Sequence, residues 1–302
     1  MQNILFLTVI NILDVDKSLL VPSTNGKTFP PQNKSDYTIE YLFYKHIQNN
    51  DSYSSNLHYI PIQWENSLND NLITDKIKSS ITKLQKDNKK MFTLSRLTGG
   101  PSVNLNNCII FTTGGIFNMP INQNLSYVPL PLIADKYKEI PVGNKKYIAS
   151  YIGRNTHPIR VDLEKIFKRD KNFYVKNLNN MHAEFNNEQQ EKFKKIISES
   201  YFSLAPRGFG PTSFRLYESI ELGVVPVYIG EDFLLPFSEI IDWEKLCVLV
   251  RYEDLKNLKK ILSEILNSNR YIEMINYGKY CEGKYFNNNF IFKYITDFVS
   301  KF

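Results

Sequence analysis

The sequence predicts an α/β protein with two domains, each built around a parallel sheet. Short apolar runs typical of buried strands alternate with amphipathic stretches typical of helices, and this pattern begins again near residue 146. Between the two halves, residues 127–144 carry three prolines, which indicates an extended connection. A chain of 302 residues also suits two domains of about 150 residues each. Strands that alternate with helices favour parallel, doubly wound sheets.

The first half holds four predicted strands with helices between them. The strands are expected at 3–10, 57–62, 91–95 and 108–112, and the helices at about 37–48 and 70–88. Glycine pairs follow the two later strands, Gly99-Gly100 and Gly114-Gly115. Because ligands of α/β proteins gather at the carboxyl ends of parallel strands, these turns lie where binding is expected.

The second half repeats the alternation more clearly. Strands are predicted at 146–153, 172–177, 201–206, 224–230 and 246–250, and helices at 159–168, 187–200, 213–222 and 254–267. The aromatic-rich residues 271–302 are predicted to be helical. We therefore expect an N-terminal domain at 1–140, a C-terminal domain at 141–280, and a helical segment at 281–302 that packs back on the first domain. The cleft between two such domains is the expected ligand site.

Charge and composition argue against several classes of protein. The chain has 37 basic and 31 acidic residues, and its basic runs at 83–90 and 192–195 fall in helix-like segments. We interpret these runs as solvated helix faces, so no nucleic-acid partner is predicted. The three cysteines are widely spaced and form no CxxC pair, and the four histidines show no ligand spacing. Buried thiols in a reducing compartment and no metal site are therefore expected.

The apolar N-terminus lacks the features of a signal peptide or an anchor. Its run is short, has no basic beginning and ends in Asp14 and Asp16, and no other segment approaches the ~20 apolar residues of a membrane span. The sequence therefore predicts a soluble, cytoplasmic protein without a transmembrane segment. Asp14-Val15-Asp16 has the D-x-D form of a metal-binding signature, but it follows the first predicted strand and is interpreted as a loop feature.

Residues 204–230 concentrate special backbone chemistry and charge. Pro206 ends a strand, Arg207 and Gly208 begin a glycine-rich loop, and Thr212 and Ser213 are good N-cap residues for the helix that follows. Gly223 falls where a C′ glycine ends that helix. Amide groups at a helix N-terminus favour an anion, most often phosphate, and the planar arginine fork suits a diphosphate.

Glu218 lies five residues after Ser213, so it can face the same site. A carboxylate there is a natural partner for the vicinal hydroxyls of a ribose. The alternative is that Arg207 and Glu218 form an intramolecular ion pair and the glycines only shape a turn.

The fifty or so residues from 200 to 250 resemble the signature region of exostosin-type glycosyltransferases. In that family a strand leads into a P-R-G loop, followed by S-F-R-(L/F)-x-E on a helix, G-x-x-P-V, P-F and a D-W pair. Weaker similarity extends to "YIASYIGRNTHPIR", "MFTLSRLTGGP" and "YVPLPL". The resemblance implies a GT-B architecture of two facing Rossmann-like domains.

The resemblance also implies a reaction and its site. It implies inverting transfer from a UDP-sugar to a hydroxyl of a glycan or glycoconjugate acceptor, with no cofactor or metal required. Arg207 and Gly208 would hold the diphosphate, Thr212 and Ser213 would cap it, and Glu218 would bind the ribose. Further positions are also donor-binding candidates. Gly153 would let the phosphates approach, and Arg154 or Arg160 would supply a second cation. Arg215 would either contact the donor or pair with Glu239, and Asp232 would lie near the donor sugar.

One spacing bears on the stereochemistry of transfer. Retaining GT-B enzymes often carry two glutamates eight positions apart, the second five residues before a glycine. Glu218 and Gly223 fit the second glutamate and its glycine, whereas the first would fall at Gly210. This favours inversion. A GDP-sugar transferase of the fucosyl type is the alternative family, although its strand before the donor helix does not end in "APRG".

The catalytic base is the least determined residue. In this architecture it comes from the N-terminal domain, where Asp36, Glu65 and Asp135 are candidates. Glu65 follows a strand, and Asp135 follows the proline-rich connection. A non-catalytic exostosin-like scaffold or glycan-binding subunit stays an alternative. Because many eukaryotic members carry an N-terminal membrane anchor, a bacterial or viral cytosolic enzyme is expected.

Overall fold

The computed structural model describes residues 10–15, 17–20, 38–50, 53, 55–64, 71–101, 103–115, 125–133, 136–137, 141, 143–178 and 187–302. The chain forms two compact units. Unit 1 draws its described residues from Met1–Lys27, Ser35–Leu130 and Asn288–Phe302, and unit 2 from Pro131–Asn287. The chain thus enters unit 2 after Leu130 and returns to unit 1 at Asn288.

Unit 1 contains a parallel sheet in which neighbouring strands follow chain order, β1-β2-β3-β4-β5. Its strands are β1 Asn11–Ile12, β2 His58–Ile60, β3 Met91–Ser95, β4 Cys108–Thr112 and β5 Leu125–Pro129. Every residue of β3 and β4 is buried, which explains their continuous apolar runs. The predictions at 91–95 and 108–112 are confirmed. Of the strand predicted at 3–10, only Ile10 lies within the described residues.

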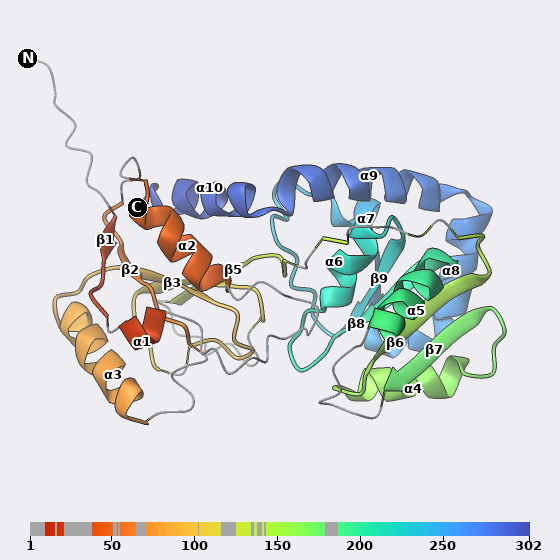
Figure 1. Cartoon of the computed structure of the whole chain (residues 1–302), viewed down its shortest axis with the longest axis horizontal. Coiled ribbons are helices and arrows are strands. Elements are labelled where there is room, and N and C mark those ends of the chain that lie inside the picture. The colour runs from red at the N-terminus through yellow and green to blue at the C-terminus, as the bar shows by residue number, and fades with distance from the viewer. Residues whose placement is uncertain are drawn as a thin grey trace, which may run out of the picture. The chain divides into compact units, whose positions relative to one another are not determined.

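Helices cover both faces of this sheet (Figure 1). On one face, α1 Lys17–Leu20 and α3 Asn71–Lys86 contribute to an apolar core with Ile60, Met91 and Ile110. On the other face, α2 Ile39–Gln48 brings Phe43 against the rings of Tyr59 and Phe92, with centroids 5.3 and 6.3 Å away. Because strand side chains alternate between faces, adjacent residues supply the two cores.

The last helix, α10 Asn288–Val299, belongs to the aromatic face of unit 1. Phe292 packs on Phe43 with ring centroids 5.6 Å apart, and Phe298 packs edge-on against Phe111 at 5.6 Å. Ser55 Oγ donates a 2.7 Å hydrogen bond to the carbonyl oxygen of Val299. The C-terminal segment thus completes the core that the N-terminal segment begins.

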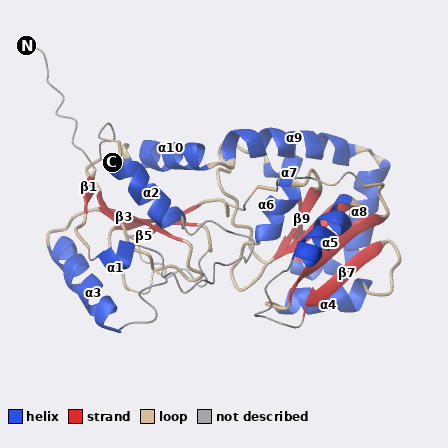
Figure 2. Ribbon diagram, in the orientation of Figure 1, coloured by secondary structure: helices blue, strands red, loops and turns tan. Residues whose placement is uncertain are grey.

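Unit 2 contains a second parallel sheet, whose strands are drawn in red in Figure 2. Its strand order is β10-β9-β8-β6-β7. Its strands are β6 Tyr147–Arg154, β7 Phe173–Leu178, β8 Ser200–Pro206, β9 Val225–Gly230 and β10 Val248–Arg251. The chain winds from β6 out to β7 and then returns to the other side of β6 with β8. This reversal makes a topological switch point between β6 and β8, where doubly wound sheets bind ligands.

Unit 2 is covered on both faces as well. The core of one face is formed with α4 Pro158–Phe167, the 3₁₀ helix η2 Tyr252–Asn257 and α8 Leu258–Asn267. The other face carries α5 Asn187–Ser198 and α6 Phe214–Glu221. Two further helices, α7 Trp243–Leu246 and α9 Arg270–Tyr285, pack against each other, and α9 also contacts α6. The α/β class with two Rossmann-like units is confirmed.

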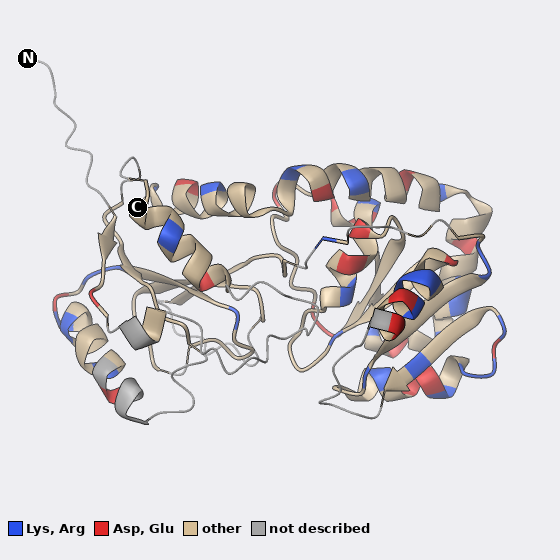
Figure 3. Ribbon diagram, viewed as in Figure 1, with Lys and Arg blue, Asp and Glu red and all other residues tan. Residues whose placement is uncertain are grey.

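The structure corrects two predicted segment boundaries and supports the predictions about the cysteines and the charged helix faces. Residues 127–129, predicted as part of the connection, pair with β4 as the end of β5. The helix predicted at 254–267 is divided, because its first turn is 3₁₀. All three cysteines are free and buried, as expected. Lys192 and Lys195 of α5 are exposed, in keeping with a solvated face, whereas Lys194 is buried and pairs with Glu191 at 2.6 Å (Figure 3). Within the described ranges, no helix is long and apolar enough to cross a bilayer.

Candidate functional site

The carboxyl ends of β6, β8 and β9 bring three charged side chains to one edge of the unit 2 sheet. Arg154 ends β6, Arg207 follows β8 and Glu231 follows β9. All three strands are parallel neighbours, so their carboxyl ends share an edge. The loop after β6 leads into α4 and the loop after β8 leads into α6, so two helices begin at the switch point.

Arg160, in the first turn of α4, ties these two loops together. Its Nη1 donates to the carbonyl oxygen of Arg154 at 2.9 Å, at the end of β6. Its Nε and Nη2 donate to the carbonyl oxygens of Arg207 and Pro206 at 2.9 and 3.0 Å, at the end of β8. These contacts are those of a positioning residue that fixes the loops. Contact of Arg160 with a donor, expected from the sequence, stays a prediction.

Two glycines are explained by close packing at this edge. A Cβ on Gly208 would lie 3.1 Å from Arg160 Nη2 and 3.2 Å from Thr156 Oγ1. A Cβ on Gly153 would lie 2.3 Å from the hydroxyl oxygen of Tyr151. Gly153 therefore makes room for the Tyr151 hydroxyl, and the expectation that it also lets phosphates approach stays a prediction. A side chain at position 153 would require the Tyr151 hydroxyl to move, and one at position 208 would press on the side chains of Arg160 and Thr156.

Arg207 forms an ion pair with Glu231, its Nη1 lying 2.8 Å from Glu231 Oε2. Only 12% of the Arg207 side chain is exposed, against 43% of the Glu231 side chain. The alternative pair of Arg207 with Glu218 does not form; Glu231 takes that place. His157 lies beside the pair, with its Nε2 3.9 Å from Glu231 Oε1. The three side chains come from the loops after β6, β8 and β9.

The protonation states of this cluster follow from its contacts. Burial, the nearby Arg207 guanidinium and Arg160 lower the pKa of His157, against the opposing effect of Glu231. Burial alone would raise the pKa of Glu231, but the hydrogen bond and the charge of Arg207 lower it overall. His157 Nδ1 accepts a hydrogen bond from the Ile159 amide at 3.3 Å. The neutral imidazole therefore carries its proton on Nε2, which faces Glu231.

The start of α6 lies as the sequence predicts, with one difference. Ser213 is the N-cap residue of α6, but its side chain makes no capping hydrogen bond. Thr212 and Ser213 are 9% and 6% exposed. At the other end Gly223 has φ +67° and follows the C-cap Leu222, so the predicted C′ glycine is confirmed. The Ser213 hydroxyl is therefore not engaged in holding the helix.

Arg215 and Glu218 form a buried pair on α6. Arg215 Nη1 lies 3.1 Å from Glu218 Oε2, and Arg215 Nη2 donates to the Ile152 carbonyl oxygen at 2.7 Å. The Arg215 guanidinium also lies 3.9 Å from the ring centroid of Phe193. The suggested partner Glu239 is thus wrong: Arg215 pairs with Glu218. The Tyr137 hydroxyl donates to Glu218 Oε1 at 3.5 Å.

A comparison with known families decides where the chain belongs. Residues 85–265, more than half of the chain, match the exostosin GT47 domain. The chain belongs to the exostosin GT47 domain family. The match runs from the end of α3 into α8, so it contains His157, Arg207, Ser213, Glu218 and Glu231. The predicted resemblance to exostosin-type glycosyltransferases is confirmed.

Three relatives of this GT47 protein come from plants. A probable glucuronoxylan glucuronosyltransferase of Arabidopsis thaliana is 40% identical over 77 residues, 26% of this chain and 16% of that protein. "Probable glucuronoxylan glucuronosyltransferase IRX7" of the same plant is 29% identical over 195 residues, 57% of this chain and 41% of that protein. A probable glucuronosyltransferase of Oryza sativa subsp. japonica is 26% identical over 182 residues, 55% of this chain and 40% of that protein. The chain spans less than half the length of these relatives.

Solved structures are more distant from the GT47 chain. Sucrose-phosphate synthase from Thermosynechococcus elongatus has a TM-score of 0.48 and 10% identity, covering 87% of this chain and 77% of that one. TarM has a TM-score of 0.43 and 9% identity, covering 86% and 58%.

Sequence reasoning missed two carboxylates of the GT47 chain, the partly buried Glu221 and the buried Glu40. Glu221 accepts a hydrogen bond from the Tyr137 amide, and burial raises its pKa to about 7. In unit 1, Glu40 is 3% exposed and accepts from the Arg96 amide at 2.7 Å, just after β3 ends. Glu221 lies within the signature region at 200–250 and Glu40 lies outside it, but the role of each depends on what packs around it rather than on neighbouring residues in the sequence.

The other predicted residues are placed as follows. Asp232 is exposed in the loop after β9, beside Glu231. The base candidates Glu65, Asp135 and Asp36 lie outside the described residues, as does Asp16 of the D-x-D. Among the residues that the structure does describe, no group of three or more His, Cys, Asp or Glu side chains is placed to hold a metal ion.

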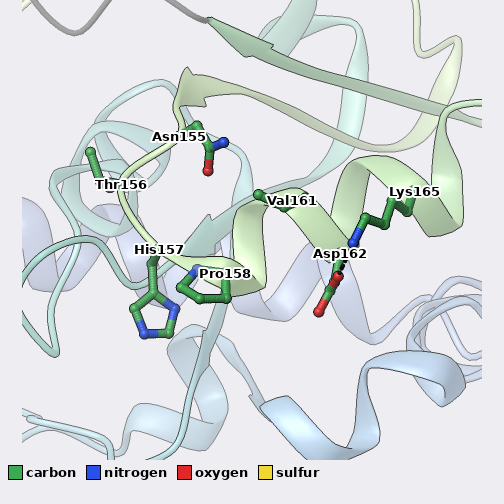
Figure 4. A pocket seen from close by; sticks show the side chains of 7 residues that line it. All are labelled: Asn155, Thr156, His157, Pro158, Val161, Asp162 and Lys165. Atoms are coloured by element: carbon green, nitrogen blue, oxygen red, sulfur yellow. Dashed lines mark hydrogen bonds and ion pairs between the residues drawn. The ribbon is translucent and has the colours of Figure 1, made fainter.

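A shallow pocket of about 390 Å³ opens at the start of α4 (Figure 4). The Lys165 ammonium and the Asp162 carboxylate pair at 3.1 Å on the same helix, and the His157 ring lies at the beginning of that helix. Arg207, Ser213 and Glu218 do not line the pocket, but His157 does, so the pocket adjoins the cluster of His157, Arg207 and Glu231 through this residue. The lining residues are Asn155, Thr156, His157, Pro158, Val161, Asp162 and Lys165.

Proposed function

We propose that this GT47 protein is a glycosyltransferase that binds a UDP-sugar at the switch point of unit 2 and transfers its sugar to a hydroxyl of a glycan. The proposal rests on the position of Arg207. Its guanidinium is nearly buried and follows β8, one loop before the N-terminus of α6. A permanent cation beside helix amides suits a diphosphate. Family membership supports the class of reaction.

The site residues supply what departure of a nucleoside diphosphate requires. Negative charge grows on the diphosphate as the glycosidic bond to the donor breaks, and fixed cations and N–H donors stabilise it. Arg207 and the first amides of α6 take this role in the proposal, and the Ser213 hydroxyl, which makes no capping bond, adds a donor. Glu218, held by Arg215, is the proposed ribose ligand.

Glucuronate is the first donor sugar to test. The three relatives described above are named as probable glucuronosyltransferases, which supports UDP-glucuronate as the donor. Inverting stereochemistry is supported by Gly210, which stands where a retaining enzyme of this architecture often has a glutamate. Glu65 and Asp135 stay the proposed bases, to be tested by replacement with glutamine and asparagine. A cytoplasmic location also stays a prediction.

The proposal is tested by the change Arg207→Ala, with Arg169→Ala as the matched control. Arg169 is an exposed arginine of the same unit, so its loss changes net charge equally. Binding of UDP, GDP and UDP-glucuronate is measured by calorimetry. We expect Arg207→Ala to weaken UDP binding at least tenfold, because a charge-assisted bidentate contact contributes roughly 1.5–3 kcal/mol. Arg169→Ala should bind as the wild type does.

Several outcomes would contradict this function. Equal UDP affinity in the wild type and Arg207→Ala would remove Arg207 from the donor site. Preference for GDP would favour the fucosyl-type alternative. Nucleotide binding without hydrolysis or transfer of any donor sugar would favour a non-catalytic glycan-binding subunit.

A further inference from the structure

Arg207 meets a carboxylate in the free protein, at the place where the donor's diphosphate is proposed to bind. Arg207 and Glu231 lie 24 residues apart in the chain and join the loops after β8 and β9 at 2.8 Å. The side chains of the two partners differ in how far they are exposed to solvent. The Arg207 side chain is 12% exposed and its amide is bonded to the Ile229 carbonyl oxygen at 2.9 Å, whereas the Glu231 side chain is 43% exposed. Glu231 is therefore the partner able to move into solvent.

Carboxylate and phosphate oxygens compete for the same donors of a guanidinium. Both accept parallel N–H···O bonds from its planar fork, so a carboxylate can hold an arginine in the geometry that a phosphate needs. We propose that Glu231 is a displaceable counterion, which orients Arg207 in the free protein and is replaced by the diphosphate when a donor binds. The proposal rests on the proposed function, because it concerns the same arginine.

His157 completes the arrangement. Its Nδ1 is held by the Ile159 amide at 3.3 Å, and its Nε2 lies 3.9 Å from Glu231. The ring thus presents an N–H donor to the position that Glu231 vacates. A diphosphate that replaces Glu231 meets the guanidinium of Arg207 on one side and this imidazole N–H on the other.

The counterion also explains how the site can reject weaker anions. A ligand must outcompete a carboxylate that is already in place, and a diphosphate carries more charge and more acceptor oxygens than a single phosphate. Removal of the Glu231 charge should therefore strengthen the binding of every phosphate anion that displaces the carboxylate, by a similar factor for each. The expected gain is roughly two- to fivefold, the range measured for partly exposed ion pairs.

The experiment compares wild type, Glu231→Gln and the control Glu239→Gln by calorimetry with pyrophosphate, inorganic phosphate and UDP. Glu239 is an exposed glutamate eight residues later, so its replacement makes the same change in net charge. We expect Glu231→Gln to bind pyrophosphate and UDP roughly two to five times more tightly, and Glu239→Gln to match the wild type. Glu231→Ala should change affinity in the same direction, and thermal unfolding verifies that each variant is folded.

His157→Asn provides a second readout. Asparagine retains a side-chain oxygen for the N-cap of α4 but lacks the ring N–H at Nε2. We expect it to weaken pyrophosphate binding roughly two- to fivefold while the midpoint of thermal unfolding stays within a few degrees.

The outcomes separate this inference from the proposed function. If UDP binds the wild type and both Glu231 variants bind it no more tightly, the counterion is overturned while the donor site stands. If the Glu231 variants bind pyrophosphate more tightly but no protein binds UDP, the counterion is supported and the nucleotide donor is not. If neither pyrophosphate nor UDP binds to any of the proteins, both proposals fail.

Discussion

At the scale of single residues, environment decides role more than residue type does. Three arginines near the switch point have different partners: Arg160 binds three backbone carbonyls, Arg215 a buried glutamate and a phenylalanine ring, and Arg207 a half-exposed glutamate. The guanidinium that is paired with a half-exposed carboxylate at the sheet edge is the one suited to an external anion. The other two hold the site together.

Glu221 gives a prediction on pH and stability. Its pKa in the folded protein is raised to about 7, chiefly by burial. Since the unfolded chain releases this proton near pH 4.5, the folded state binds more protons between about pH 4.5 and 7, and the free energy of unfolding falls as pH rises through that range. Glu221→Gln keeps an acceptor for the Tyr137 amide and removes the charge. We expect it to be more stable than wild type at pH 8, by on the order of 1 kcal/mol after solvent screening.

Urea unfolding at pH 5, 6, 7 and 8 checks this prediction. The stability gained by Glu221→Gln should grow with pH and level off above pH 7. If the gain in stability is the same at all four pH values, the pKa of Glu221 is not raised in the folded protein.

At the scale of elements, α6 connects the glycine loop to the sheet. Its limits were readable from Ser213 and Gly223, because caps act through the local backbone. The structure adds that the cap hydroxyl makes no bond to the helix. A typical N-cap serine contributes about 1 kcal/mol to stability, and here that contribution is missing.

Ser213→Ala therefore separates stability from binding. We expect the free energy of unfolding to change by less than about 0.5 kcal/mol, because no capping bond is lost. UDP affinity should fall severalfold, because the proposed donor to the diphosphate is removed. Denaturant unfolding and calorimetry on one preparation measure both quantities. A loss of about 1 kcal/mol or more in stability with unchanged affinity would instead assign Ser213 an ordinary capping role.

At the scale of the whole chain, unit 1 depends on both ends of the sequence. Phe292 and Phe298 of α10 cover Phe43 and Phe111, which come from the first 130 residues. Truncation after Asn287 would expose this aromatic face, at a cost of several kcal/mol for the loss of two buried aromatic contacts. We expect unit 1 to unfold at a lower temperature, while unit 2 keeps its core.

Limited proteolysis with mass spectrometry tests the truncation. New cleavage sites should concentrate in the described parts of residues 38–130, and residues 143–178 and 187–287 should stay protected and serve as the internal control. Equal protection of both regions would show that α10 contributes little to unit 1.

The sequence by itself determined the local elements and the family. Buried strands such as β3 and β4, and the glycine that ends α6, follow from short runs of residues whose pattern of burial or backbone conformation is set locally. The loop and helix from Arg207 to Glu218 were likewise visible as a motif, because a strand, a glycine loop and a helix N-terminus are contiguous in the chain.

Only the tertiary structure decided the partners. Arg207 pairs with Glu231 rather than Glu218, and Arg160 binds carbonyls up to 47 residues away. Residues 125–129 join the sheet as β5, and α10 returns to unit 1 across more than 200 residues to Ser55. Such pairings depend on which strands and helices pack together, and the same residue types would permit several alternatives. The local sequence pattern therefore shows where the site lies, whereas tertiary packing decides which charged residues pair with one another there.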